Sequence, residues 1–158
     1  MRLIAITAAL AALLDQISKY VVIHAMNLAQ IRAIDVAPPL LNFRYGENRG
    51  INFGLLGDGT SRWLLIGLAA LICAVVLWWL RGARQRPIAL LSAGLLIGGA
   101  LGNVIDRLIY GYVLDFLNMS CCGIQNPFVF NVADIFIFAG ALGLVFFAED
   151  RKGGKKRA

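Results

Sequence analysis

The sequence contains few charged residues. Only 15% of its 158 residues are Asp, Glu, Lys or Arg, whereas 59% are apolar, and the mean hydropathy is +0.74. About a quarter of the residues in an ordinary soluble domain are charged, so this composition excludes that class and predicts an integral membrane protein. A chain of this length is expected to form one domain, here residues 1–158.

Histidine and cysteine are also scarce. His24 is the single histidine, and the cysteines, Cys73, Cys121 and Cys122, form no Cys-x-x-Cys motif. These residues are too few for a disulfide framework and do not favour a zinc site. The motifs His-Glu-x-x-His and Gly-x-Ser-x-Gly are absent, which argues against zinc and serine peptidases. The redox state of the neighbouring Cys121 and Cys122 stays open.

The most prominent feature of the sequence is a set of long apolar runs. A helix needs about 20 residues to cross a bilayer. Runs of roughly that length lie at residues 3–23, 63–80, 88–109 and 131–148. The sequence therefore predicts an all-α membrane protein built as a bundle of four transmembrane helices.

The positive charges indicate how these helices are oriented. The net charge is +6, and nine of the fifteen Lys and Arg residues lie at Arg2, in the loop 81–87 and in the tail 149–158. The positive-inside rule places such segments in the cytoplasm, together with both termini. A basic tail beside anionic lipid acts as a topology anchor, so we expect no nucleic-acid partner.

The segments 24–62 and 110–130 then face the outer side. The first contains Pro38-Pro39 and several glycines, and Leu40–Tyr45 alternates in part between apolar and polar residues, which favours a short strand. We predict a small β-rich platform there and an outer loop or helix segment at 110–130.

Two aspartates follow consecutive apolar runs at this outer edge. A carboxylate at membrane depth costs about 2.5–3.5 kcal/mol and usually has a function. Asp115 lies just beyond one run and Asp134 at the start of the next, where Asn131 could cap the helix. Helix capping alone would account for Asn131 and Asp134. The position of Asp115 on the same side favours a carboxyl pair that shares one proton.

Such a pair could perform acid–base catalysis on a peptide bond. The ionised member would take a proton from an attacking water, and the protonated member would donate to the carbonyl oxygen. The positive end of the helix dipole favours a carboxylate at Asp134, so we assign Asp134 as the first base. Because the proton belongs to the pair, this assignment is a hypothesis about one microstate.

Other polar residues surround this candidate site. Asp15 and Lys19 are four residues apart and can form a salt bridge within the first helix. The small residues at 98–102 favour close helix packing, and Asn103 and Arg107 continue as a polar stripe toward the outer end.

Two further positions carry no firm catalytic assignment. The segment Asn48-Arg49-Gly50 is typical of a turn, or its Asn could recognise an extended peptide backbone. We assign no role to Asp106.

The motifs resemble those of the lipoprotein signal peptidase family, also called signal peptidase II. They agree in order, spacing and four-span layout over residues 15–134. The matching residues are Asp15-Gln16-x-x-Lys19, Asn48-x-Gly50, Gly98-Gly99-Ala100-Leu101-Gly102-Asn103-x-x-Asp106-Arg107, Gly111-Tyr112-Val113-Leu114-Asp115-Phe116 and Phe130-Asn131-Val132-Ala133-Asp134.

The resemblance implies an aspartic endopeptidase of the bacterial inner membrane that needs no metal or cofactor. Its partners would be membrane lipid and diacylated prolipoproteins, cut before the lipid-bearing cysteine near the periplasmic face. A monomer is expected. Asp115 and Asp134 match the catalytic dyad, and Asp15 and Lys19 match residues that support the bundle and the site. Residues that contact substrate or the inhibitor globomycin match Asn48, Gly50, Gly99, Asn103, Arg107 and Asn131.

The sequence departs from the family pattern at two segments. The segments Ile51-Asn52-Phe53 and Ile135-Phe136 differ from the usual family residues, so we expect them to alter the pocket's shape. Two other functions are alternatives to a peptidase. A proton-coupled transporter also buries charged residues, but transporters tend to show paired repeats, and this sequence shows none. A membrane scaffold would leave Asp115 and Asp134 unexplained.

Overall fold

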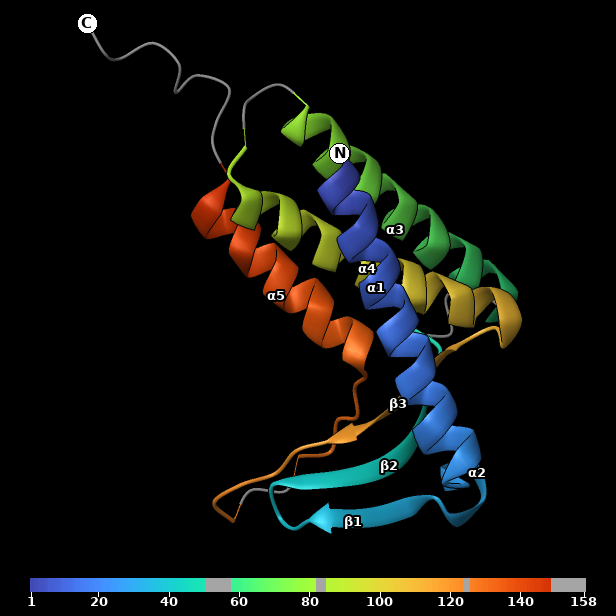
Figure 1. The fold of residues 1–158 in the computed structure, drawn as a ribbon. Helices are drawn as coiled ribbons and strands as arrows, with labels where there is room; N and C mark the ends of the chain where they lie inside the picture. The colour runs from blue at the N-terminus through green and yellow to red at the C-terminus, as the bar shows by residue number, and fades with distance from the viewer. Residues whose placement is uncertain (51–57, 82–84, 124–125, 149–158) are drawn as a thin grey trace, which may run out of the picture.

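The computed structural model describes residues 1–50, 58–81, 85–123 and 126–148. The expectations for Ile51-Asn52-Phe53 and for the tail 149–158 therefore lie outside the described residues. The described chain forms helices and a small antiparallel sheet (Figure 1). In chain order the elements are α1 (Arg2–Lys19), a π-helical turn η1 (Tyr20–Ala25), α2 (Leu28–Ile31), β1 (Ala33–Ala37), β2 (Leu41–Asn48), α3 (Asp58–Leu80), α4 (Pro87–Ile109), β3 (Val113–Asn118) and α5 (Val132–Phe147).

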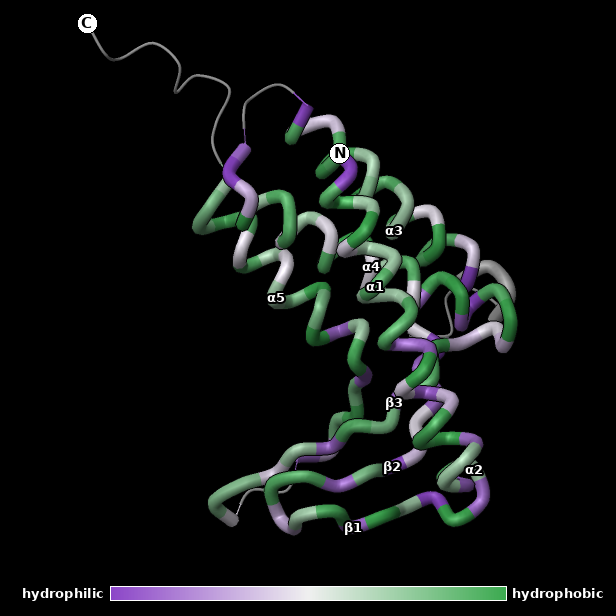
Figure 2. Tube along the Cα trace, viewed as in Figure 1, coloured by the Kyte–Doolittle hydropathy of each residue, from purple (hydrophilic) through white to green (hydrophobic). Residues whose placement is uncertain are grey.

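The long helices coincide with the predicted apolar runs. Three described segments are long and apolar enough to cross a membrane: Arg2–Ala25, Arg62–Leu80 and Pro87–Ile109. Helix α5 is also apolar but has only 16 residues, so a count of four spans stays a prediction. Figure 2 shows hydrophobic residues along the helices and hydrophilic ones where the helices meet the sheet.

Helix α4 lies at the centre of the bundle, packed between α1 and α5 with α3 along its side (Figure 1). Glycines allow this close approach, as predicted for the small residues at 98–102. Gly98 faces Ala8 and Ala11 of α1, and Gly99 faces Ala133 and Ile137 at the start of α5.

A substitution at Gly98 tests this packing. A Cβ there would lie 2.5 Å from the Ala8 carbonyl oxygen and 2.6 Å from the Ala11 Cβ, whereas at Gly67 in α3 nothing lies within 4 Å. We expect Gly98→Ala to lower the free energy of unfolding in mixed micelles by about 1–3 kcal/mol. Gly67→Ala should leave it unchanged or raise it by up to about 1 kcal/mol. Equal stability of the two variants would contradict this packing.

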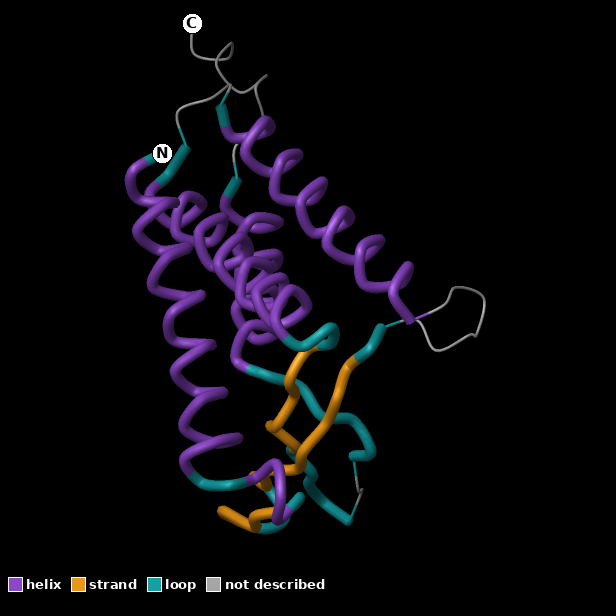
Figure 3. The backbone as a smooth tube through the Cα atoms, turned by 90° about the vertical axis from the view of Figure 1, so that its right-hand side faces the viewer, coloured by secondary structure: helices purple, strands orange, loops and turns teal. Residues whose placement is uncertain are grey.

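The sheet lies at the end of the bundle opposite the N-terminus (Figures 1 and 3). Its strand order is β1-β2-β3, and both pairings are antiparallel. Strand β2 confirms the strand expected at residues 40–45, and the sheet confirms a small β-rich platform.

Strand β3 corrects the expectation of a loop or helix at residues 110–130. Its residues Val113, Leu114 and Phe116 are buried, and so is Asp115. A strand buried on both faces lacks the alternation of polar and apolar residues that identifies a half-exposed strand. Leu114 and Phe116 pack with Ile23 of η1, which fixes β3 to the end of the first helical segment.

Candidate active site

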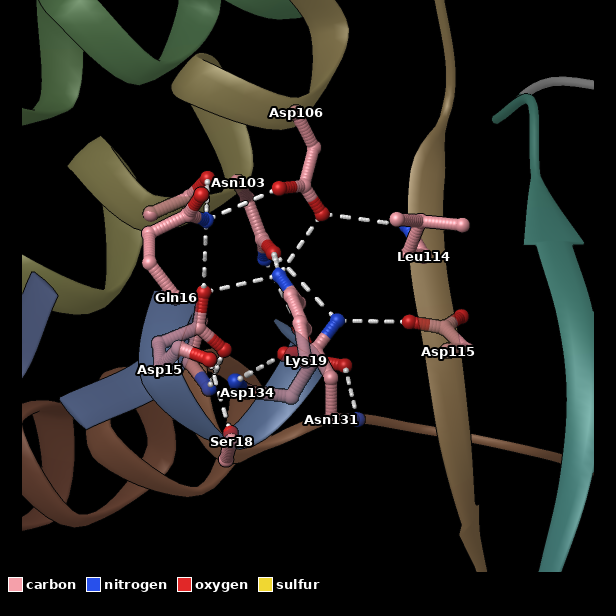
Figure 4. A network of polar contacts seen from close by, with 12 residues as sticks. Asp15, Gln16, Ser18, Lys19, Asn103, Asp106, Leu114, Asp115, Asn131 and Asp134 are labelled. Carbon is pink, nitrogen blue, oxygen red and sulfur yellow. Dashed lines mark hydrogen bonds and ion pairs between the residues drawn. The ribbon is translucent and has the colours of Figure 1, made fainter. Parts of the chain in front are cut away.

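Backbone pairing brings the two aspartates together. Asp115 lies in β3 opposite Gly46 of β2. Phe130 pairs with Leu117 of the same strand, with N–H···O distances of 2.8 and 2.9 Å in the two directions. The next residue, Asn131, caps α5, whose first turn carries Asp134. The start of α5 is therefore held beside β3, and both carboxyls reach one polar cluster (Figure 4).

Asn131 contacts both aspartates and is completely buried. Its Nδ2 donates to Asp115 Oδ1 at 2.5 Å. Its Oδ1 accepts the Asp134 backbone N–H at 2.9 Å, and its own N–H donates to Asp134 Oδ2 at 3.2 Å. The capping interpretation of Asn131 and Asp134 is thus confirmed, and the same cap is also hydrogen-bonded to Asp115.

Asn103 of α4 forms a second link at the pair. Its Nδ2 donates to Asp134 Oδ1 at 2.9 Å, and its Oδ1 accepts from Asn131 Nδ2 at 3.3 Å. Amide groups from two elements therefore fix the orientation of both carboxyls.

Asp115 has properties suited to proton transfer. Burial is the main cause that raises the pKa of its carboxyl from the ordinary 3.8 to about 7, and the nearby charge of Asp134 adds to it. Hydrogen bonds from Asn131 and Asn48 and the charge of Lys19 act in the opposite direction. Near neutral pH, Asp115 can therefore carry a proton or release it, as a catalytic acid or base must.

A buried ion triad lies behind this pair. Lys19 Nζ lies 2.8 Å from Asp15 Oδ2, which confirms the predicted salt bridge, and 2.7 Å from Asp106 Oδ2. Gly102 permits the approach of α1, because a Cβ there would lie 2.6 Å from Asp15 Oδ2.

Asp106 is the residue of this site that the sequence analysis missed. It follows Asn103 by three residues, so both lie on one side of α4. That spacing was the available signal.

An apolar groove of about 390 Å³ lies between the helices and reaches Asn103, which donates to Asp134. Residues of α3, α4 and α5 line it, among them Leu68, Ile72 and Ile137, and Asn103 and Arg107 provide its polar groups. The Arg107 guanidinium donates to the Asn103 carbonyl at 3.2 Å, which holds it along α4.

The remaining predicted residues fall in two places. Asn48 ends β2, and its Oδ1 accepts the Gly50 N–H at 3.1 Å, where Gly50 has φ +83°. This geometry is that of a turn, and the Asn48 side chain also hydrogen-bonds Asp115. Recognition of a peptide backbone by Asn48 stays a prediction. Gly99 lies at the α4–α5 contact beneath the pair. Within the described ranges, no group of three or more His, Cys, Asp or Glu residues is arranged to hold a metal ion.

Comparisons with known proteins agree with this architecture. Residues 7–148 match the family described as signal peptidase (SPase) II. The lipoprotein signal peptidase of Alteromonas mediterranea is 41% identical over 154 residues, 96% of this chain and 81% of that one. The protein of the same name from Caulobacter vibrioides is 39% identical over 150 residues, 92% and 87% of the two chains.

Solved structures show the same fold. A bacterial membrane enzyme determined by the in meso method at 1.9 Å matches with a TM-score of 0.75 and 27% identity, over 89% of this chain and 88% of that one. A second such structure, at 2.3 Å, matches with a TM-score of 0.73 and 27% identity, over 89% and 84%. The chain therefore belongs to the signal peptidase II family.

Proposed function

We propose that this protein is an aspartic endopeptidase that removes signal peptides from bacterial prolipoproteins, with Asp115 and Asp134 as its catalytic pair. The observation that carries this proposal is the hydrogen-bonded cluster in which Asn131 and Asn103 join the two carboxyls. Family membership supports the substrate class, because the curated relatives are lipoprotein signal peptidases.

The pair can complete a hydrolytic cycle without other groups. The Asp134 carboxylate takes a proton from water as the water oxygen attacks the scissile carbonyl carbon. Protonated Asp115 donates its proton to the carbonyl oxygen, which gives a tetrahedral diol. Asp115 then takes a proton back from the diol, Asp134 passes its proton to the amide nitrogen, and the C–N bond breaks. Both aspartates return to their starting states.

The environments of the two carboxyls support these roles. Asp115 is buried, with a pKa near 7, so it can hold the proton that the acid must donate. Asp134 lies in the first turn of α5, where its oxygens accept hydrogen bonds from the Asn131 N–H and Asn103 Nδ2. The positive end of a helix dipole favours a carboxylate at such a position.

The groove beside the pair suits an apolar substrate segment. We assign it to the signal peptide. The scissile bond would lie at the end of the groove where Asn103 and Arg107 adjoin the carboxyl pair, and the diacylglyceryl chains of the following cysteine would lie in the bilayer. Asn48, Gly50 and Gly99 would shape the same site from the platform and from α4. Globomycin, a cyclic peptide, is expected to compete for this groove.

The distribution of charge supports a topology. We assign α5 as the fourth span, both termini to the cytoplasm and the sheet with the active site to the periplasmic face of the inner membrane. The N-terminus and the last turn of α5 lie at the end of the bundle opposite the sheet (Figure 1). The whole chain, residues 1–158, would act as one domain and as a monomer.

A cleavage assay tests this function. Purified protein in detergent is incubated with a diacylated prolipoprotein and with the same precursor lacking the lipid, and the products are identified by mass spectrometry. We expect cleavage before the lipidated cysteine and little cleavage of the precursor without lipid. Failure of folded protein to cleave the verified substrate would overturn the proposal. Equal cleavage of both precursors would overturn the requirement for lipid.

A further inference from the structure

We propose that Asp106 is a positioning residue that fixes Asp115 through the backbone of Leu114. Together with Lys19 and Asp15 it forms a clamp that sets the separation of the two catalytic carboxyls. This inference rests on the proposed function, because it explains how the pair keeps a geometry suited to catalysis.

The first observation concerns the residues that precede the two aspartates. Asp106 Oδ2 accepts the backbone N–H of Leu114 at 3.0 Å, one residue before Asp115. Asp15 Oδ1 accepts the backbone N–H of Ala133 at 2.9 Å, one residue before Asp134. Each catalytic residue therefore follows an amide that a buried carboxylate holds in place.

The second observation is that Lys19 connects these two carboxylates. Its Nζ lies 2.8 Å from Asp15 and 2.7 Å from Asp106, and it also donates to Asn103 Oδ1 at 3.4 Å (Figure 4). The exposed fractions of Asp15, Asp106 and Lys19 are 0%, 1% and 3%. In this buried environment a broken contact is not replaced by water, so the clamp joins α1, α4, β3 and α5 rigidly.

The contacts of Asp106 distinguish it from the catalytic pair. Its Oδ2 faces the Leu114 N–H and Lys19, and its Oδ1 accepts from Gln16 Nε2 at 2.8 Å. Its oxygens are thus engaged by groups of the protein itself. Asp106 acts on the reaction through Leu114, whose position determines where the Asp115 carboxyl lies.

Two substitutions of Asp106 separate the effect of its hydrogen-bond acceptor from the effect of its negative charge. Asp106→Ala removes the acceptor of the Leu114 N–H. Asp106→Asn keeps an amide oxygen that can accept from the Leu114 N–H and from Lys19. It gives up only the hydrogen bond from Gln16 Nε2, which still donates to Asp15 Oδ2 at 3.2 Å and to the Gly102 carbonyl at 3.3 Å. Ser92→Ala is the matched control. Ser92 is another buried polar residue of α4, and among the described residues its hydroxyl donates only within that helix, to the Ile88 carbonyl at 2.8 Å.

The expected result is a loss of kcat with little change of KM. A displacement of about 1 Å can cost about 100-fold in rate, so we expect Asp106→Ala to lower kcat by about that factor. KM should stay within about threefold, because Asp106 contributes no uniform substrate binding. Asp106→Asn should retain kcat within about tenfold, and Ser92→Ala should match the unmutated protein. Hydrogen exchange of the Leu114 amide should accelerate in Asp106→Ala and remain slow in Asp106→Asn.

Other results would overturn the clamp. Folded Asp106→Ala with normal kcat would do so, and so would an equal loss of kcat in Asp106→Asn, which would show that the charge matters and the acceptor does not. If Asp106→Ala fails to fold, the Asn variant and its Leu114 exchange decide the question. If the unmutated protein cleaves no prolipoprotein, the proposed function fails, whereas the exchange of Leu114 still tests the clamp.

Discussion

Replacement of Asp115 or Asp134 by Asn is expected to reduce kcat by at least about 10³-fold while the fold is retained, because either change removes a group that must exchange a proton. An Asn side chain has nearly the same shape as Asp, so the cluster around Asn131 and Asn103 can still assemble. The reduction is measured as the rate constant for cleavage of a diacylated prolipoprotein by each variant under single-turnover conditions.

Two further variants test whether the loss of kcat is specific to the catalytic pair. Asp35→Asn replaces an aspartate of the same sheet whose side chain is 60% exposed and paired with Arg44, so it should leave kcat unchanged. The double variant of Asp115 and Asp134 should lose little more than either single variant, because residues that act as one unit are not additive. Near-normal kcat in either folded single variant would remove the pair from the mechanism.

Replacement of Asn131 is expected to affect both stability and rate. Asn131→Ala removes the cap of α5, which should lower the free energy of unfolding by about 1–2 kcal/mol. It also removes the hydrogen bonds from Nδ2 to Asp115 and Asn103, at 2.5 and 3.3 Å. With the carboxyls no longer oriented, kcat should fall by about 100-fold.

Asn131→Ser separates the two effects. Serine is a good helix cap, so most of the stability should return. Its short hydroxyl cannot replace an amide that donates to Asp115 and Asn103 while its oxygen caps the helix, so kcat should stay low. Chemical unfolding in micelles and a cleavage assay on the same samples provide both measurements. Recovery of kcat together with stability would show that Asn131 acts only as a cap.

The sequence was sufficient for the features with simple local rules. The long apolar runs predicted the bounds of α1, α3, α4 and α5 to within about five residues. A helix that crosses a membrane needs such a run. The i, i+4 spacing of Asp15 and Lys19 correctly predicted an ion pair. The cap at Asn131 followed from its place before an apolar run.

Features that depend on contacts distant in sequence were not predictable in this way. Strand β3 is buried on both faces, so its residues show no alternation, and β1 is short. Asp106 contacts Lys19 on another helix and Leu114 beyond the end of its own helix. The spacing from Asn103 places Asp106 on the side of α4 that faces the site, but it does not predict either of these partners. The pairing of Asp115 and Asp134 was inferred from their positions at one edge of consecutive apolar runs and then from motif resemblance. The structure adds the hydrogen bonds by which Asn131 and Asn103 join the two carboxyls.

The central claim is that Asp115 and Asp134 form one coupled acid–base pair. The direct test is a carbon-13 NMR titration of the Asp115 carboxyl in the unmutated protein and in Asp134→Asn. We predict a pKa near 7 in the unmutated protein. In the variant the pKa should be lower, because the charge of Asp134 is gone, yet still above the ordinary value of 3.8, because burial persists. A pKa that is the same with and without Asp134, or one near 3.8 in the unmutated protein, would contradict the account.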